Sequence, residues 1–371
     1  MLLRMTPMST PPQPYQRCMV MAGGGFRFGI YLGMFEALRQ AGRAPDVILA
    51  SCGGAIAATI IRNLPDDAAR RAWLTSPDMY RFWCGLRSTP RAKLAGTLLR
   101  AARRRLSASP APLVPDLFGD YLFELPPQLP FPPEPARPTV DVAILGGRLL
   151  FGPEQVGQPR AGRKLYAETV FCGERAAALL AGMDSPLSDP RWGRHAVARE
   201  LLTDGSVPVA AAARISISDM LYFRSQRHGA HEYIGGVVDL FPVEIARRLA
   251  GEVVLEFKEA FEQMFSIPAW RSVLGLDGNA RLRYANSQLA DMRIDSSDVS
   301  AALPSPLLQK LDWRRNRIEL AMTPDHASFV ELMDAQWRYG YERAMEACAR
   351  PPRQQPAIRS ATRHSKAHPG A

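Results

Sequence analysis

The sequence from residue 46 to residue 55 reads Asp46-Val47-Ile48-Leu49-Ala50-Ser51-Cys52-Gly53-Gly54-Ala55. A short apolar run, a turn of small residues and the start of a helix follow one another, which is the pattern of a nucleophile elbow. The elbow motif is G-x-S-x-G, and its serine is lifted clear of the edge of a sheet. Here Cys52 stands at the serine position, Ala50 replaces the first glycine, and Gly53 and Gly54 complete the turn. The sequence therefore predicts a thiol at the reactive position of an acyl-transfer site.

A glycine-rich loop lies upstream of this elbow. Residues 19–22 form an apolar run typical of a buried parallel strand, and Gly23-Gly24-Gly25-Phe26-Arg27 follows. We expect a helix after this loop, ending at Gly42. Backbone amides between a strand and a helix attract negative charge, so Gly23, Gly24, Gly25 and Arg27 are predicted to form an oxyanion hole. A tight turn that merely needs glycine and a dinucleotide-binding loop are the alternatives, although Phe28 replaces the third glycine of the latter.

A third motif occurs late in the chain, where the sequence reads Ile234-Gly235-Gly236-Val237-Val238-Asp239-Leu240-Phe241-Pro242. Pro242 predicts the first turn of a helix that runs to Leu249. An apolar run over residues 252–257 then predicts another strand.

The three motifs, in this order and spacing, resemble the patatin-like phospholipases, and the resemblance extends from Cys18 to Cys348. It implies a three-layer α/β/α fold with a mostly parallel central sheet. It also implies lipid acyl hydrolysis by a Ser-Asp dyad, without histidine, metal or other cofactor. A closing helix over residues 333–347, containing Gly340, is similar to that of the family.

The chain departs from the family at both members of the dyad. Cys52 occupies the position of the serine, and Ile234 occupies that of the aspartate and cannot accept a proton. The segment over residues 214–223 follows the family pattern only loosely. We therefore expect weak or absent ester hydrolysis. Two alternatives remain: an active Cys-dependent acyl hydrolase or acyltransferase on lipid esters, and a non-catalytic pseudoenzyme that binds lipid or protein.

A cysteine changes what the site requires. A free thiol titrates near ~8.5, and a helix N-terminus lowers that value, so Cys52 could react without a strong base. Deacylation still needs activated water, which Ile234 cannot supply. Asp239 is the candidate substitute for the missing base, with His231 and Glu232 in the same stretch. The simplest alternative is that Cys52 is a small buried apolar residue in a tight turn.

The chain of 371 residues is 47% hydrophobic, and its motifs belong to a single α/β unit. We expect a flexible N-terminus over residues 1–17, a patatin-like domain over 18–349 and a disordered basic tail over 350–371. A proline-rich insertion over 107–138 holds ten prolines together with aromatic residues. It is either an ordered cover on the domain or a loop across the back of the sheet. Gly146-Gly147 predicts the turn of a hairpin formed by residues 141–145 and 148–151.

The net charge is +10, and the tail from Arg350 supplies half of this excess with five basic residues and no acidic ones. A basic amphipathic helix is expected over residues 91–105, and such a helix either lies on an anionic membrane surface or packs on the core with a solvated basic face. No nucleic-acid-binding motif accompanies the charge, so we expect no nucleic-acid partner. The expected partner is a lipid or acyl-ester substrate.

Five cysteines, at positions 18, 52, 84, 172 and 348, are scattered and odd in number. They show neither a C-x-x-C motif nor the Cys/His spacing of a metal site, so we expect no metal and a reducing, cytoplasmic location. No apolar run reaches the length that spans a bilayer, and any membrane contact is expected to be peripheral.

Overall fold

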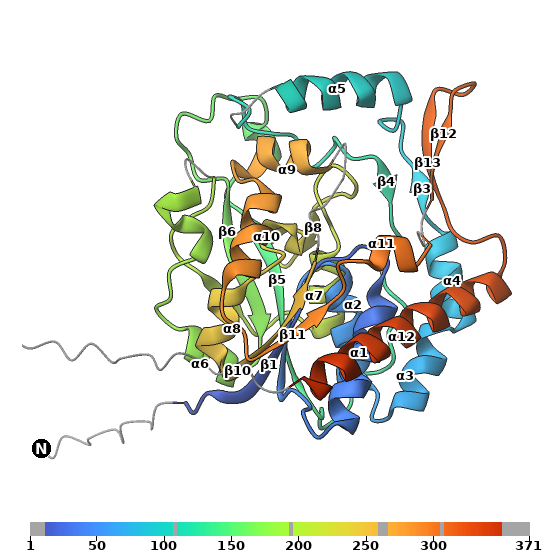
Figure 1. Ribbon diagram of the computed structural model, residues 1–371. Helices are drawn as coiled ribbons and strands as arrows, with labels where there is room; N and C mark the ends of the chain where they lie inside the picture. The colour runs from blue at the N-terminus through green and yellow to red at the C-terminus, as the bar shows by residue number, and fades with distance from the viewer. Residues whose placement is uncertain (1–11, 107–109, 193–195, 259–265, 305–307, 351–371) are drawn as a thin grey trace, which may run out of the picture.

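The computed structural model describes residues 12–106, 110–192, 196–258, 266–304 and 308–350. Within these ranges nine strands form the central sheet at the middle of Figure 1. They are β1 (Tyr15–Met21), β2 (Val47–Ala50), β5 (Asp141–Leu149), β6 (Tyr166–Cys172), β7 (Leu202–Asp204), β8 (Gln226–His228), β9 (His231–Ile234), β10 (Ala250–Phe257) and β11 (Met292–Asp295). The order along the sheet is β11-β10-β1-β2-β5-β6-β7, and β9 pairs with β5 and β8 beside this path.

The middle of the sheet is parallel. β1 pairs in parallel with β2 and with β10, β10 with β11, and β2 with β5. β6 and β7 are also parallel, whereas β5 runs antiparallel to β6 and to β9. The predicted mostly parallel sheet is confirmed. Tyr15 already belongs to β1, so regular structure begins before Cys18, where the sequence placed the start of the domain.

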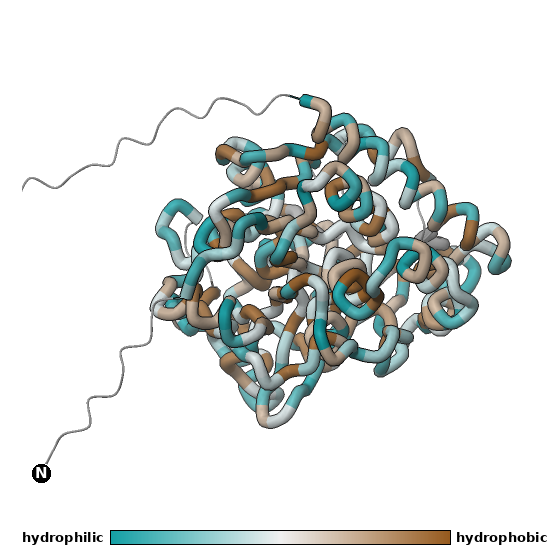
Figure 2. Tube along the Cα trace, turned by 90° about the horizontal axis from the view of Figure 1, so that it is seen from below, coloured by the Kyte–Doolittle hydropathy of each residue, from teal (hydrophilic) through white to brown (hydrophobic). Residues whose placement is uncertain are grey.

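The two faces of the sheet are covered by different helices. Along β1, Cys18 and Val20 face one apolar cluster, and Met19 and Met21 face the other, as the two-residue period of a strand requires. The first cluster includes α6 (Glu174–Leu180), α8 (Val243–Leu249), α9 (Ser266–Leu274) and α10 (Gly278–Ser287). The second includes α1 (Phe28–Gln40), α2 (Gly53–Asn63), α3 (Asp67–Leu74), α4 (Pro77–Cys84), α7 (Val209–Ser216) and α12 (His326–Ala349). Figure 2 shows hydrophobic segments enclosed by hydrophilic ones, and the predicted three-layer α/β/α fold is confirmed.

The remaining short elements lie in the connections. They are α11 (Val299–Ala302) and the 3-10 turns η1 (Pro153–Gln155), η2 (Pro186–Ser188), η3 (Pro190–Trp192) and η4 (Gly236–Val238). None of the helices in the described ranges is both long and apolar enough to cross a membrane.

The predicted hairpin at Gly146-Gly147 was wrong, because β5 continues through both glycines to Leu149. The glycines are needed for packing rather than for a turn. A Cβ at Gly146 would lie 3.0 Å from the ring of Phe171, and one at Gly147 would lie 2.9 Å from Val238 Cγ1. A glycine in a strand interior commonly marks such a close approach.

The closing helix α12 crosses α1 at very short range. A Cβ at Gly33 would lie 2.0 Å from the carbonyl oxygen of Trp337, and one at Gly340 would lie 2.0 Å from that of Ile30. These two glycines let the helix backbones touch, which fixes α12 against the helix that follows the glycine loop.

A small layer, here called the cap, covers the carboxyl edge of the parallel strands. It consists of α5 (Leu94–Leu106), the paired strands β3 (Arg87–Ser88) and β4 (Phe123–Glu124), and the hairpin of β12 (Leu308–Asp312) and β13 (Arg317–Ala321), all in the upper part of Figure 1. Its apolar interior contains Leu94, Phe123, Leu221, Phe223 and Ile318.

The described part of the proline-rich insertion, residues 110–138, packs along the domain. Val114 and Leu117 belong to the first core cluster, Phe123 belongs to the cap, and Phe131 packs on the second core cluster. Trp73 Nε1 donates a 2.7 Å hydrogen bond to the carbonyl of Pro130. Residues 1–11 of the predicted flexible N-terminus and residues 351–371 of the predicted disordered tail lie outside the described residues.

Candidate acyl-transfer site

The elbow holds Cys52 in a backbone conformation that side chains rarely adopt, with φ 50° and ψ −122°. Such strain persists only where the surroundings enforce it. A Cβ at Gly53 would lie 2.0 Å from the carbonyl oxygen of Gly25, and one at Gly54 would lie 2.0 Å from that of Met21. The two glycines after Cys52 therefore let the elbow press against β1 and the glycine loop. Ala50, at the first elbow position, is fully buried in β2.

A carboxylate stands beside the thiol. Cys52 Sγ donates a hydrogen bond of 3.2 Å to Asp219 Oδ2. Asp219 lies three residues after Ser216, the last residue of α7, and its Oδ1 is buried without a hydrogen-bond partner among the described residues. The sequence analysis placed Ile234 at the position of the acid and named Asp239 as the candidate substitute, whereas the carboxylate that reaches the sulfur comes from Asp219 in another segment.

The electrostatics of this pair keep the proton on sulfur. Burial and then the Asp219 carboxylate raise the pKa of the Cys52 thiol well above its ordinary value. Burial raises the pKa of Asp219 to about 7, although its hydrogen bond from the Cys52 thiol lowers it. Above that pH the pair is thiol and carboxylate, which is a nucleophile with an adjacent base.

Backbone amides face the same sulfur. The amides of Gly53 and Gly25 interact with Cys52 Sγ and lower the thiol pKa, although burial outweighs them. Gly25 has φ 59°, which glycine adopts without strain. A Cβ at Gly23 would lie 3.3 Å from Cys52 Cβ, so the loop lies against the elbow. The backbone amide of Cys52 does not face an incoming oxyanion, because it donates a 2.9 Å hydrogen bond to Ser216 Oγ. Donors for an oxyanion are therefore left to the glycine loop and Gly53.

A buried polar network of Lys258, Tyr31 and Glu256 supports the glycine loop. Lys258 Nζ donates hydrogen bonds to the carbonyl of Gly23 (3.1 Å) and to the hydroxyl of Tyr31 (2.9 Å). Lys258 Nζ also lies 3.0 Å from Glu256 Oε2, which is 2.7 Å from the Tyr31 hydroxyl. A Cβ at Gly24 would lie 3.1 Å from the same ammonium. Arg27 lies at the exit of the loop, where its guanidinium is 3.5 Å from Ser300 Oγ.

Ile234 ends β9 and packs against the sheet. It pairs with Gly147, is 1% exposed and carries no polar atom on its side chain. The glycines that follow it nevertheless frame the site. A Cβ at Gly235 would lie 2.6 Å from Asp219 Oδ1, and one at Gly236 would lie 2.5 Å from Ser216 Oγ. The third motif thus keeps its glycines while the acid comes from the loop after α7.

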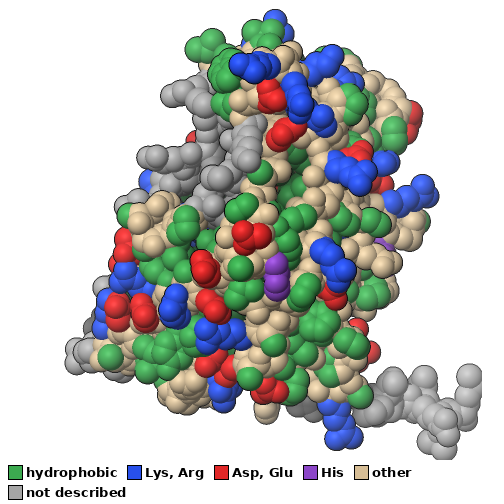
Figure 3. All heavy atoms as spheres, turned by 90° about the vertical axis from the view of Figure 1, so that its right-hand side faces the viewer, with side chains coloured by type: hydrophobic (Ala, Val, Ile, Leu, Met, Phe, Trp, Pro, Cys, Tyr) green, Lys and Arg blue, Asp and Glu red, His purple; other side chains and the backbone are tan. Residues whose placement is uncertain are grey.

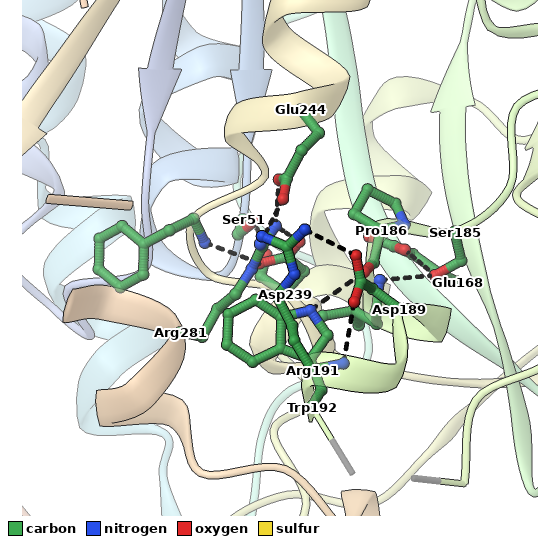
Figure 4. Close-up of polar contacts among 12 residues, drawn as sticks. Ser51, Glu168, Ser185, Pro186, Asp189, Arg191, Trp192, Asp239, Glu244 and Arg281 are labelled. Atoms are coloured by element: carbon green, nitrogen blue, oxygen red, sulfur yellow. Dashed lines mark hydrogen bonds and ion pairs between the residues drawn. The ribbon is translucent and has the colours of Figure 1, made fainter. Parts of the chain in front are cut away.

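Asp239 is engaged away from the thiol, so the structure does not bring this candidate base to Cys52. Its carboxylate receives two hydrogen bonds from Arg281, at 3.1 and 2.7 Å, and Arg281 also pairs with Glu244. Figure 4 shows Arg281 directed at both acids, with Ser51 beside Asp239. Ser51 Oγ donates a 2.9 Å hydrogen bond to the backbone carbonyl of Asp239, so Asp239 stabilises the elbow through its main chain.

The other two candidates from that stretch also lie elsewhere. His231 is exposed at the start of β9, and the Glu232 carboxylate accepts a 2.6 Å hydrogen bond from Ser225. Within the described ranges, no three His, Cys, Asp or Glu side chains gather as a metal site would require.

The sequence did not predict Asp219, yet one signal pointed to it. Asp219 is the only acidic residue between Asp204 and Glu232, a stretch that includes the loosely matching segment over residues 214–223. A search for any acid near the third motif, rather than at its first position, would have included it.

A comparison with models of known protein families agrees with the arrangement of these motifs. A family model described as "Patatin-like phospholipase" matches residues 19–247, which include the glycine loop, the elbow and Asp219. Among solved structures, the chain is similar to VipD from Legionella pneumophila, at 14% identity and a TM-score of 0.36, over 91% of this chain and 67% of that one. No curated protein matches the chain. Because the family model covers more than half of the 371 residues, the chain belongs to the patatin-like phospholipase family.

Proposed function

We propose that the chain is a lipid acyl hydrolase in which Cys52 is the nucleophile and Asp219 is the general base. The observation that carries this proposal is the 3.2 Å separation between Cys52 Sγ and Asp219 Oδ2. A base with a pKa of about 7 suits proton transfer at neutral pH, because efficient catalysis needs a pKa close to the working pH. This favours an active thiol enzyme over the weak or absent hydrolysis expected from the sequence.

In the first half of the proposed reaction, Asp219 takes the thiol proton while Sγ attacks the ester carbonyl. The carbonyl oxygen becomes negative and is stabilised by amides of the glycine loop and Gly53. The carbon–oxygen bond to the alcohol then breaks, and Asp219 returns the proton to the departing alkoxide. The product of this half is a thioester on Cys52 and a free alcohol.

In the second half, Asp219 removes a proton from water, whose oxygen attacks the thioester carbonyl. The carbon–sulfur bond breaks, a fatty acid is released, and the sulfur recovers its proton from Asp219. An alcohol in place of water would make the same chemistry an acyl transfer. The substrate class proposed is therefore a carboxylic ester of a lipid.

The test is hydrolysis of p-nitrophenyl butyrate and of a phospholipid by four proteins: the parent, Cys52→Ala, Asp219→Asn and Cys84→Ala. Cys84 is an exposed thiol far from the elbow in sequence and serves as the matched control. We expect loss of turnover in Cys52→Ala, a fall of roughly 10²-fold or more in Asp219→Asn, and no change in Cys84→Ala. Intact mass after exposure to the ester should show an adduct on the parent and none on Cys52→Ala.

A non-catalytic lipid- or protein-binding protein is the second candidate, favoured by the 7% exposure of Cys52. Turnover that is absent from the parent, or equal in the parent and Cys52→Ala, would contradict the hydrolase and support this candidate. We also propose a reducing, cytoplasmic location, supported by five cysteines that form no disulfide. The membrane contact that we propose is peripheral.

A further inference from the structure

Large apolar side chains are concentrated on the outside of the cap. Among the described residues, eight large hydrophobic side chains are exposed, and four of them lie on α5 and the β12–β13 hairpin. They are Leu99 (54%), Leu106 (89%), Leu311 (41%) and Trp313 (70%). Half of the exposed large hydrophobic side chains thus share a layer that forms a small part of the chain.

The helix α5 has a second apolar stripe that faces solvent. Its inner side carries Leu94 and Leu98, which pack on the cap interior. Leu99, Ala102 and Leu106 follow a spacing of three and four residues, and all three are exposed, as is Arg103 beside them. The outer stripe therefore serves no packing within the described chain.

The hairpin turn and α5 form one continuous surface. Leu94 N–H donates to the carbonyl of Asn316 at 3.0 Å, and Ala95 N–H donates to its side-chain oxygen at 2.9 Å. Both elements reach the upper end of the molecule in Figure 1, and Figure 3 shows hydrophobic side chains beside Lys and Arg side chains at that end. Trp313 and the leucines of α5 can therefore face the same partner.

This surface is strongly basic. The exposed cations Arg91, Lys93, Arg103 and Arg314 form no ion pair within the described ranges. Arg100 and Arg104 share Asp120 at 3.6 and 4.0 Å, so one carboxylate serves two guanidiniums. Unpaired cations on the same elements as an exposed tryptophan and exposed leucines match the interface of an anionic bilayer, where aromatic rings sit at headgroup level and cations meet phosphates.

We propose that the outer face of the cap, formed by α5 and the turn of the β12–β13 hairpin, docks on an anionic phospholipid bilayer. This deepens the proposed function and rests on it, because it says where the lipid ester is found. The cap interior contains Leu221 and Phe223, which follow Asp219, and Phe26, which follows Gly25, packs against it. Docking therefore brings the layer that covers the thiol to the lipid surface.

The experiment is co-sedimentation of the full chain with phosphatidylcholine vesicles that contain or lack phosphatidylglycerol. One test variant removes the apolar contacts (Leu99→Ser, Leu106→Ser, Trp313→Ala), and the other reverses two charges (Arg103→Glu, Arg314→Glu). The matched controls are Leu289→Ser, an exposed leucine preceding β11, and Arg338→Glu, an exposed arginine of α12. Figure 1 shows α12 well below α5.

We expect the parent to bind vesicles with phosphatidylglycerol more tightly than those without it, and each test variant to lose about tenfold or more in affinity. Both controls should bind as the parent does. If the parent binds vesicles with and without phosphatidylglycerol equally tightly, or if the test variants bind as the controls do, the docking face is overturned. Binding that falls only with the charge reversals would indicate attraction to any polyanion and would also overturn it.

Hydrolysis of p-nitrophenyl butyrate separates this inference from the proposed function. The docking variants should hydrolyse this soluble ester at the parent rate, since their substitutions lie on the outer surface. Loss of vesicle binding with unchanged ester turnover supports both proposals. Loss of vesicle binding in a protein without any Cys52-dependent turnover supports the docking face and contradicts the hydrolase.

Discussion

At the scale of single residues, the pairing of Cys52 with Asp219 makes a prediction about thiol reactivity. The carboxylate raises the pKa of the thiol, so Asp219→Asn should lower it and increase the thiolate fraction at neutral pH. The rate of alkylation by iodoacetamide, followed against pH by intact mass, should therefore rise in the variant while ester hydrolysis falls. An unchanged alkylation profile would mean that the two side chains do not interact in solution.

The same pair sets the pH dependence of hydrolysis. Asp219 acts as a base only after it loses its proton, so kcat/KM should rise with pH and level off above about 7. The rise should disappear in the residual activity of Asp219→Asn. A parent profile that is flat from pH 5 to pH 8 would contradict the role of this carboxyl.

Gly235 offers a further test at this scale. A Cβ there would lie 2.6 Å from Asp219 Oδ1, so Gly235→Ala should displace the carboxylate and lower kcat by about tenfold or more. Gly173→Ala is the control, because no atom lies within 4 Å of the added Cβ and its φ is −70°. Equal activity in both variants would show that the carboxylate position is not set by this contact.

At the scale of the elements, the crossing of α1 and α12 depends on backbone contact. Gly33→Ala places a Cβ 2.0 Å from the carbonyl of Trp337, which should cost about 1–3 kcal/mol in the free energy of unfolding. Gly96→Ala, inside α5 with open space around it, should instead stabilise by ~0.5–1 kcal/mol. Denaturant unfolding of both variants against the parent measures the two signs, and a stabilising Gly33→Ala would contradict the close crossing.

The elements that the sequence predicted are those set by local spacing. Strand, glycine turn and helix follow one another within a few residues around Cys52 and around Gly25, so periodicity and turn chemistry suffice there. Gly146-Gly147 was misinterpreted, because a glycine pair that serves packing between neighbouring layers has the same local signature as a turn. The sequence could offer Asp219 only as one acid near the third motif, since its contact with the thiol depends on how α7 and the stretch after β9 meet in the fold.

At the scale of the whole molecule, a buried acid makes the free energy of unfolding depend on pH. Burial and then the charge of Asp239 raise the pKa of Glu168 from 4.5 to about 8, and its carboxyl accepts a hydrogen bond from Ser185. The folded chain keeps a proton that the unfolded chain releases, so this group lowers the free energy of unfolding as pH rises from about 4.5 to about 8.

Glu168→Gln removes that titration while keeping a hydrogen-bonding side chain of the same size. The melting temperature of the variant should fall less between pH 5 and pH 8 than that of the parent. Glu154→Gln, an exposed acid in η1, is the control and should follow the parent. Parallel curves for the parent and Glu168→Gln would show that Glu168 titrates alike in the folded and unfolded states.

The missing side chains of Gly146 and Gly147 have a mechanical consequence for chemistry at the elbow. Ile215 of α7 approaches the first glycine from one face, and Ile234 of β9 approaches the second from the other, so both segments rest almost directly on the β5 main chain. One of these segments leads to Asp219 and the other to Gly235. The distance from the sulfur to the carboxylate therefore depends on how closely these two isoleucines approach the β5 main chain. A single methyl group added at either glycine would push one segment away from β5. It would thereby lengthen the distance between Cys52 Sγ and the Asp219 carboxylate, across which the proton must pass.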